Sequence, residues 1–213
     1  MANRKVGIIG YGEGGKQIEY LIKEDQQEEI EFFYFDDVLQ GLGTKNAFSF
    51  ASFDDNEFND LEFYIGLGYR HLQVKRELCE QLQKNGFHFP ALIHKTAYVH
   101  PTATIGNGAV IYPMANIGFN VVLSDGVVIN NSSVISHNTF VGAATFISPA
   151  VSLMGFVNVG VECFLGAGTI IANGLKVGNR VTSGIGTMIT KDVGDDALII
   201  GNPSRLIEHL SIK

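Results

Sequence analysis

The 213-residue chain has only two cysteines, Cys79 and Cys163, and they lie far apart in the sequence. Two such cysteines give neither a disulfide framework nor a metal-type spacing. We therefore expect both thiols to be reduced, as in a cytoplasmic protein, and the sequence predicts no metal site.

Basic residues are scarce as well. The chain has 15 lysines and arginines against 22 aspartates and glutamates, which gives a formal net charge of −7. A nucleic-acid backbone binds basic protein surfaces, so this balance disfavours a nucleic-acid partner. It leaves room for a local basic pocket that binds a phosphorylated ligand.

Long apolar runs are also missing. The first apolar stretch, residues 6–9, is too short for a signal peptide and far too short to span a bilayer. Later apolar runs are interrupted by polar residues. We expect no membrane segment and a cytoplasmic location.

Glycine is abundant, with 25 residues, and the second half of the chain is periodic. An aliphatic residue recurs at every sixth position from residue 105 to residue 177 without interruption. The residue after it is usually small, and the residue four places on is small or β-branched. A flat strand followed by a tight corner explains this unit, and fixed self-similarity of this kind is typical of a solenoid. The aliphatic positions are Ile105, Ile111, Ile117, Leu123, Ile129, Ile135, Val141, Ile147, Leu153, Val159, Leu165, Ile171 and Val177.

Residues 1–93 follow a different pattern. Strand-like segments at 6–9, 30–35 and 61–65 alternate with helix-like segments at 16–23 and 70–85, which indicates a small parallel α/β sheet. The fold class we expect is therefore mixed. A Rossmann-like α/β domain covers residues 1–93, and a parallel β-helix covers residues 94–213.

A glycine loop follows the first strand. Gly10, Gly12 and Gly15 match the G-x-G-x-x-G pattern between a strand and a helix, and Asp36 and Asp37 stand at the end of the next strand. This pattern is the Rossmann fingerprint, in which glycines let the backbone approach phosphates. About ninety residues form only half of a full dinucleotide fold. A nucleotide-type ligand, an empty structural turn and a dinucleotide oxidoreductase are the alternatives at this point.

The hexad pattern resembles that of the hexapeptide-repeat acyltransferases. The resemblance implies a left-handed β-helix with three hexads per coil, roughly four coils here, and a homotrimer with active sites between neighbouring prisms. Several segments resemble the bacterial UDP-4-amino-sugar N-acetyltransferases of bacillosamine biosynthesis: the glycine loop, Asp36–Asp37, Gly66–Leu67–Gly68, and residues 85–87, 92–97, 100–103 and 200–205. The same family includes sialic acid O-acetyltransferases, and the likeness covers nearly the whole chain.

The resemblance also implies site residues. The small domain would hold the nucleotide sugar, UDP-linked in the family, through its loop and strand ends. These substrate-binding candidates are Gly10, Gly12, Glu13, Gly14, Asp36, Asp37 and Gly68. The acetyl-CoA contacts carry over as Phe146, Gly155, Ala167 and Ile185.

His137 is the one histidine inside the regular repeats, and it occupies a corner position. Acetyl transfer to an amine needs a proton acceptor near neutral pKa, for which histidine is suited. The segment 130–137 resembles the one that carries the family's catalytic histidine, so we expect His137 to be the general base. The alternative is a solvated corner histidine.

Three family side chains are replaced. Asn138 stands where the family usually has an acidic residue after the catalytic histidine. Phe146 replaces the histidine that contacts acetyl-CoA, and Gly14 replaces the loop histidine.

The implied function is acetyl transfer from acetyl-CoA to a nucleotide-linked 4-amino-6-deoxy sugar in surface glycan synthesis. Sugar O-acetylation and a catalytically silent nucleotide-sugar-binding protein are the alternatives. Lys176, Arg180, Lys191 and Arg205 are candidates to meet the phosphates of CoA, or are simply solvated.

Overall fold

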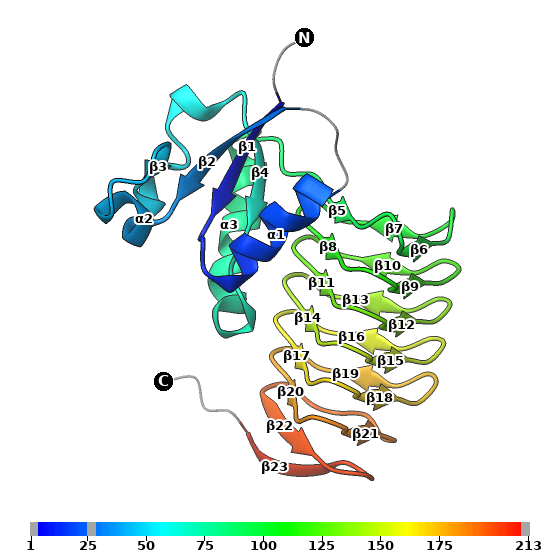
Figure 1. Ribbon diagram of the computed structural model, residues 1–213. Coiled ribbons are helices and arrows are strands. Elements are labelled where there is room, and N and C mark those ends of the chain that lie inside the picture. Colours follow the sequence, from blue (N-terminus) through cyan, green and yellow to red (C-terminus); the bar gives the residue numbers. More distant parts are fainter. Residues whose placement is uncertain (1–3, 25–28, 210–213) are drawn as a thin grey trace. The chain divides into compact units, whose positions relative to one another are not determined.

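The computed structural model describes residues 4–24 and 29–209 (Figure 1). These residues form two compact units, which are divided between Pro90 and Ala91. The boundary falls after Pro90 rather than after residue 93, because Leu92 and Ile93 pair with Val110 and Ile111 of the repeat region.

The first unit is built on a parallel sheet with the strand order β3-β2-β1-β4. Its strands are β1 (Arg4–Ile9), β2 (Ile30–Phe35), β3 (Ala47–Phe48) and β4 (Glu62–Ile65). Its helices are α1 (Glu13–Glu24), α2 (Asp37–Gly41) and α3 (Leu72–Lys84), with short 3-10 turns η1 (Phe50–Ser52), η2 (Asn56–Phe58) and η3 (Tyr69–His71). The alternation predicted from the sequence is confirmed, and the short edge strand β3 is an addition to it.

Helices cover both faces of this sheet. Ile9, Phe35 and Phe63 belong to a core cluster with Leu78 and Leu82 of α3. The adjacent Ile8 points to the other face, where an ideal β-carbon on Gly15 of α1 would lie 3.3 Å from its side chain. Successive strand residues point to opposite faces, so each strand supplies both layers.

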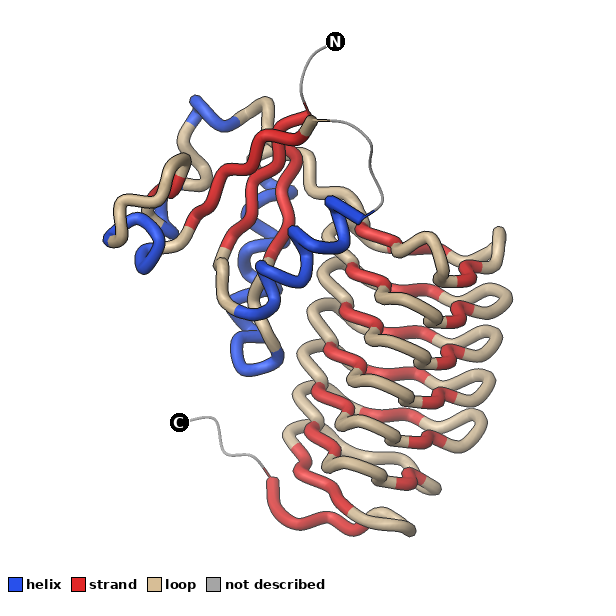
Figure 2. The backbone as a smooth tube through the Cα atoms, viewed as in Figure 1, coloured by secondary structure: helices blue, strands red, loops and turns tan. Residues whose placement is uncertain are grey.

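The second unit is a left-handed parallel β-helix whose described strands form three sheets, called here the first, second and third walls. Figure 2 shows the short strands stacked along each wall with loops at the corners. The first wall holds β5 (Leu92–Ile93), β8 (Val110–Ile111), β11 (Val128–Ile129), β14 (Phe146–Ile147), β17 (Phe164–Leu165), β20 (Thr182–Ser183), β22 (Ala197–Ile200) and the antiparallel β23 (Arg205–His209). The second wall holds β6 (Tyr98–Val99), β9 (Asn116–Ile117), β12 (Val134–Ile135), β15 (Ser152–Leu153), β18 (Ile170–Ile171) and β21 (Met188–Ile189). The third wall holds β7 (Thr104–Ile105), β10 (Val122–Leu123), β13 (Phe140–Val141), β16 (Asn158–Val159) and β19 (Lys176–Val177).

The predicted inward positions form the core of this solenoid. Of the thirteen aliphatic residues, Ile111 to Val177 are buried and Ile105 packs against them. Residues eighteen apart are paired in register, for example Ile129 with Ile147 and Ile147 with Leu165. Each coil therefore consists of three hexads.

The solenoid is longer than the predicted four coils. The five-stranded third wall marks five complete coils within the described residues, and β20, β21 and β22 extend the stack further. The coil begins at β5, ahead of the first predicted hexad, and it continues past Val177. In the last coil Ser183 pairs with Ile199, sixteen positions on, so the hexad spacing is lost there although the wall continues.

No helix within the described ranges is long and apolar enough to cross a membrane.

Candidate functional site

His137 lies at the corner between β12 and β13, on what we call the second edge, where the second wall meets the third. The neighbouring Ile135 and Val141 point inward and are fully buried, so the backbone that carries the corner is fixed by the core. The imidazole itself is exposed. A rigid frame therefore presents an accessible histidine, which is what proton transfer to a bound substrate requires.

Three residues surround the imidazole. The side-chain Nδ2 of Asn138 lies 3.2 Å from its Nδ1 atom. The Phe156 ring meets it edge-on, with centroids 5.1 Å apart. Below it, a β-carbon at Gly155 would lie 2.5 Å from Cε1, so only glycine leaves room for the ring. We call Asn138, Gly155 and Phe156 the imidazole seat.

The predicted acetyl-CoA contacts lie on two edges and in one wall of the solenoid. Gly155 lies beside His137, as described. Ala167 and Ile185 follow β17 and β20 at the first edge, between the first and second walls, where Gly186 donates its N–H to the Ala167 carbonyl at 2.8 Å. Phe146 belongs to β14 in the first wall and packs against Phe164, with ring centroids 5.9 Å apart. One chain thus brings Gly155 to the candidate base but keeps Ala167 and Ile185 on another edge.

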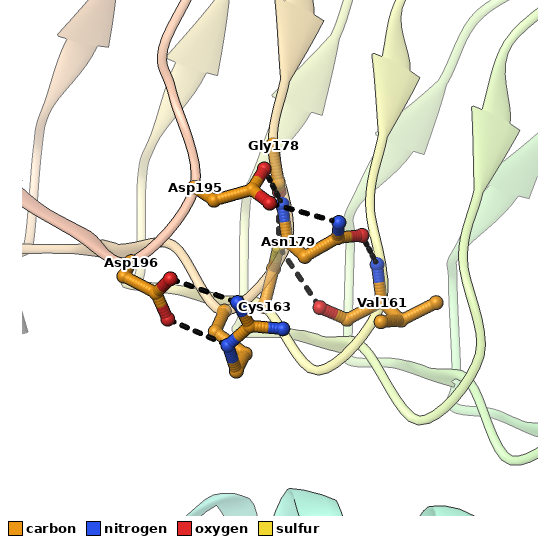
Figure 3. A network of polar contacts seen from close by, with 7 residues as sticks. Val161, Cys163, Gly178, Asn179, Asp195 and Asp196 are labelled. Atoms are coloured by element: carbon orange, nitrogen blue, oxygen red, sulfur yellow. Dashed lines mark hydrogen bonds and ion pairs between the residues drawn. The ribbon is translucent and has the colours of Figure 1, made fainter. Parts of the chain in front are cut away.

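The basic candidates also differ in position. Arg180 lies between β19 and β20, on the third edge, where the third wall meets the first. Its guanidinium donates two hydrogen bonds to Asp196 at 2.5 and 2.8 Å. Figure 3 shows this corner, where Asn179 accepts from the Val161 N–H and Asp195 accepts from the Asn179 N–H. These contacts tie successive coils together and give Arg180 a structural role.

Lys191 is exposed and follows β21, so it lies on the same second edge as His137, three coils further along. At about 4.8 Å per coil this is about 14 Å along the edge. Lys176, on the outward side of β19, and Arg205, in β23, are also exposed. Lys191 is therefore the basic candidate that shares the edge of His137.

Cys163 points into the solenoid and is fully buried. Burial raises the pKa of its thiol to about 11, against weaker opposing hydrogen bonds from the backbone and Thr145. A buried, protonated thiol is a poor nucleophile, so the thioester has no cysteine to attack it at this position.

In the first unit, the predicted substrate residues gather at one edge of the sheet. The loop Gly10–Glu13 follows β1, Asp36 follows β2 and Gly68 follows β4, and all three strands are parallel. The order β3-β2-β1-β4 makes the carboxyl ends of β1 and β4 a topological switch point, where open α/β sheets bind ligands.

The glycines of this loop serve close backbone packing. A β-carbon on Gly10 would lie 2.7 Å from the Leu67 side chain, and one on Gly14 would lie 2.4 Å from the Gly66 carbonyl oxygen. Gly12 and Gly68 have open space around them. Glu13 is exposed and forms an ion pair with Lys16 at 2.8 Å. The open positions, Gly12 and Gly68, are the ones where a ligand can approach the backbone.

The two aspartates already have internal partners. Asp36 accepts hydrogen bonds from the backbone N–H groups of Tyr11, Val38 and Leu39, at 2.8, 3.0 and 3.1 Å. Asp37 accepts from the Ser49 hydroxyl and the Phe50 N–H. Asp36 therefore ties the glycine loop to the start of α2.

Four residues that support these sites were missed by the sequence reasoning: Asn120, Phe156, Tyr11 and Glu19. The eighteen-residue coil was a usable signal for the first two, because it places residues 120, 138 and 156 at consecutive corners of one edge. The Tyr11 hydroxyl donates to the carboxylate of Glu19, which is buried in α1, and no sequence pattern indicates that contact.

Within the described ranges, no three histidine, cysteine or acidic side chains come together as metal ligands.

Comparison with known proteins gives the class. No family model matches the chain. YvoF of Bacillus subtilis (strain 168), a proposed acetyltransferase, is 43% identical over 54 residues, which is 25% of this chain and 31% of YvoF. The chain thus matches less than a third of this curated relative.

Solved structures match over nearly the full length. The acetyltransferase domain of PglB from Neisseria gonorrhoeae FA1090, in complex with acetyl coenzyme A, is 30% identical, with a TM-score of 0.88, over 97% of this chain and 100% of that domain. PerB from Caulobacter crescentus, solved with CoA and GDP-perosamine, shares the fold at 24% identity and a TM-score of 0.86, over 98% of this chain and 99% of PerB.

The stacked hexads and the full-length likeness define a hexapeptide-repeat acyltransferase, and the chain belongs to that family. Among its members, the chain matches the PglB acetyltransferase domain in both units.

Proposed function

We propose that the chain transfers an acetyl group from acetyl-CoA to the amino group of a nucleotide-linked 4-amino-6-deoxy sugar, in surface glycan synthesis. The carrying observation is the exposed imidazole of His137, seated against Gly155 on a rigid corner. The relatives agree with this chemistry, because the PglB domain was solved with acetyl-CoA and PerB with CoA and a GDP-linked sugar.

His137 takes up the proton that the amine must lose. As the amine nitrogen attacks the thioester carbonyl, the C–N bond forms and the proton passes to the imidazole. The C–S bond then breaks, and the proton passes to the departing thiolate of CoA. The acetyl group moves directly to the sugar, and the buried thiol of Cys163 takes no part.

The switch point of the first unit is the proposed nucleotide-sugar site. Gly10, Gly12, Glu13 and Gly14 line the loop after β1, and Gly68 follows β4. Gly12 and Gly68 leave the backbone open to a ligand. Asp36 and Asp37 act there mainly by shaping the loop, since their carboxylates already accept internal hydrogen bonds. UDP is the proposed nucleotide, from the resemblance to the bacillosamine enzymes.

The division of the predicted acetyl-CoA residues between two edges supports the proposed homotrimer. His137 and Gly155 lie on the second edge, whereas Ala167 and Ile185 lie on the first. The second wall separates these edges within one chain, so in the proposed trimer the first edge of a neighbouring subunit meets this second edge and completes one site. Ile185 is 85% exposed and Phe156 61% exposed, as apolar groups at such an interface would be in one subunit alone. A cytoplasmic location remains a prediction of the sequence.

A thiol-release assay tests the reaction. The purified chain is given acetyl-CoA and a panel of UDP-, dTDP- and GDP-linked 4-amino sugars, with the matching 4-hydroxy sugars as controls. We expect CoA release with an amino sugar and none with its hydroxyl analogue. Release with the hydroxyl sugar alone would make the chain an O-acetyltransferase. Acetyl-CoA binding without release in any reaction would make it a silent binding protein.

A further inference from the structure

The imidazole of His137 ends a short chain of side-chain amides. Asn120, one coil earlier on the second edge, donates from Nδ2 to the Oδ1 atom of Asn138 at 3.3 Å. The Nδ2 atom of Asn138 in turn lies 3.2 Å from Nδ1 of His137. An amide NH₂ group can only donate, so the imidazole accepts at Nδ1 in this arrangement.

Backbone geometry does not require asparagine at these two corners. Asn120 and Asn138 have φ values of 54° and 55°, in the left-handed region. Ala144, Phe156 and Arg180 occupy equivalent corners at 54°, 61° and 55°. Many side chains fill this position, so the turn alone leaves the choice of residue open, and at these two corners the amide groups form the chain of contacts to His137 described above.

We propose that Asn138, held by Asn120, is a positioning residue that sets which nitrogen of His137 carries the proton. This inference rests on the proposed function only for its consequence in catalysis. In the observed arrangement Nδ1 accepts, and the neutral ring therefore carries its proton on Nε2. To leave Nε2 free as a base, the amide must turn over and present Oδ1 to an Nδ1–H group.

A carboxylate at position 138 behaves differently. It can only accept, so it holds the proton on Nδ1 and leaves the Nε2 lone pair available at all times. It also stabilises the imidazolium that forms when the base takes up a proton. The amide of Asn138 neither holds the proton on Nδ1 at all times nor carries a charge that stabilises the imidazolium. We therefore expect the amide to limit turnover in this chain and Asn138→Asp to raise it.

Nitrogen chemical shifts of the histidine ring test the proposal without any substrate. The full-length protein, labelled with ¹⁵N-histidine, is compared with Asn138→Asp, Asn138→Ala and Asn120→Ala. Asn107→Ala, at an exposed corner of the third edge, is the matched control. We expect the parent and the control to show the Nε2–H form and Asn138→Asp to show the Nδ1–H form. Both alanine variants should shift toward a mixture of the two forms.

Kinetics provide the second readout. Asn138→Ala should raise kcat by up to about 2- to 12-fold, the worth of the one hydrogen bond that favours the Nε2–H form, and leave the KM for acetyl-CoA unchanged. Asn138→Asp should raise kcat. Identical ring shifts in the parent, Asn138→Asp and Asn138→Ala would overturn the proposal, whether or not the chain acetylates a sugar. Altered ring shifts without acetyl transfer in any variant would overturn the proposed function and leave the positioning role intact.

Discussion

The imidazole of His137 lies directly against the Cα of Gly155, one coil further along the solenoid, where an added β-carbon would approach its Cε1 and Nε2 atoms to 2.5 and 2.6 Å. The two residues are joined by backbone as well, because the N–H of Phe156 donates to the His137 carbonyl at 3.0 Å. The family resemblance predicts that Gly155 contacts acetyl-CoA, and the structure places the same residue beneath the imidazole ring.

Gly155→Ala should therefore displace the His137 ring. The backbone at this position is not in the left-handed region, so alanine fits the coil, and the clash falls on the imidazole. We expect kcat to fall by about 10- to 100-fold, short of complete loss of the general base. Thermal unfolding should change little. Steady-state kinetics at saturating acetyl-CoA, with a melting curve, check this. Unchanged kcat would show that the ring has no need of this seat.

The solenoid could be predicted from the sequence because its core repeats. One inward aliphatic residue per hexad, as at Ile129 and Ile147, dictates both the wall and the register. The prediction stopped at Val177 because a polar residue, Ser183, takes the next inward place. There its hydroxyl lies 2.8 Å from that of Thr169, so a hydrogen bond replaces apolar packing. A contact between side chains on different coils, such as that of Asn120 with Asn138, can be predicted only when the coil length and the side-chain rotamers are known. The sequence does not give the rotamers.

The carboxylate of Glu19 should make the first unit acid-sensitive. Burial alone would raise the pKa of Glu19, but hydrogen bonds from Lys23, Tyr11 and Tyr34 outweigh it and lower the pKa below the ordinary value of 4.5. A lowered pKa means that Glu19 stabilises the fold at pH values above the ordinary glutamate range. This stabilisation is lost as the pH falls through the folded-state pKa.

Glu19→Gln should remove part of the pH dependence of the first unit's stability. The variant should unfold at a lower temperature than the parent at pH 7, and the two melting temperatures should converge as the pH falls below 4.5 and through the lowered folded-state pKa. Glu13→Gln, at an exposed ion pair, is the control and should behave as the parent does. Parallel pH curves for the parent and Glu19→Gln would contradict the assignment.

Asp36 should affect sugar binding through the loop. Asp36→Ala removes the acceptor for the Tyr11 N–H and the N-cap of α2, which costs about 1 kcal/mol of stability. We expect the KM for the nucleotide sugar to rise several-fold because the glycine loop loses its anchor, with the KM for acetyl-CoA unchanged. Asp36→Asn keeps one acceptor oxygen, so its KM for the nucleotide sugar should lie between those of the parent and Asp36→Ala. If Asp36→Ala instead raised the KM for acetyl-CoA, Asp36 would act at the acetyl-CoA site, and its assignment to the sugar site would be wrong.

Lys191 and Arg180 form a matched pair for the phosphates of CoA. Lys191 is exposed on the second edge, whereas Arg180 is bound to Asp196 on the third. Lys191→Ala should raise the KM for acetyl-CoA by about two- to fivefold, the worth of one exposed ion pair, and the rise should shrink in high salt. Arg180→Ala should leave this KM unchanged. A larger effect from Arg180 would reverse their assigned roles.

The role of His137 as the general base is tested by the single-turnover rate of acetyl transfer by His137→Ala, with both substrates saturating and the oligomeric state verified by light scattering. We expect a trimer that still binds acetyl-CoA and transfers the acetyl group about 10²- to 10⁴-fold more slowly than the parent. A variant that transfers acetyl at the parent's rate would remove His137 from the reaction and contradict the account.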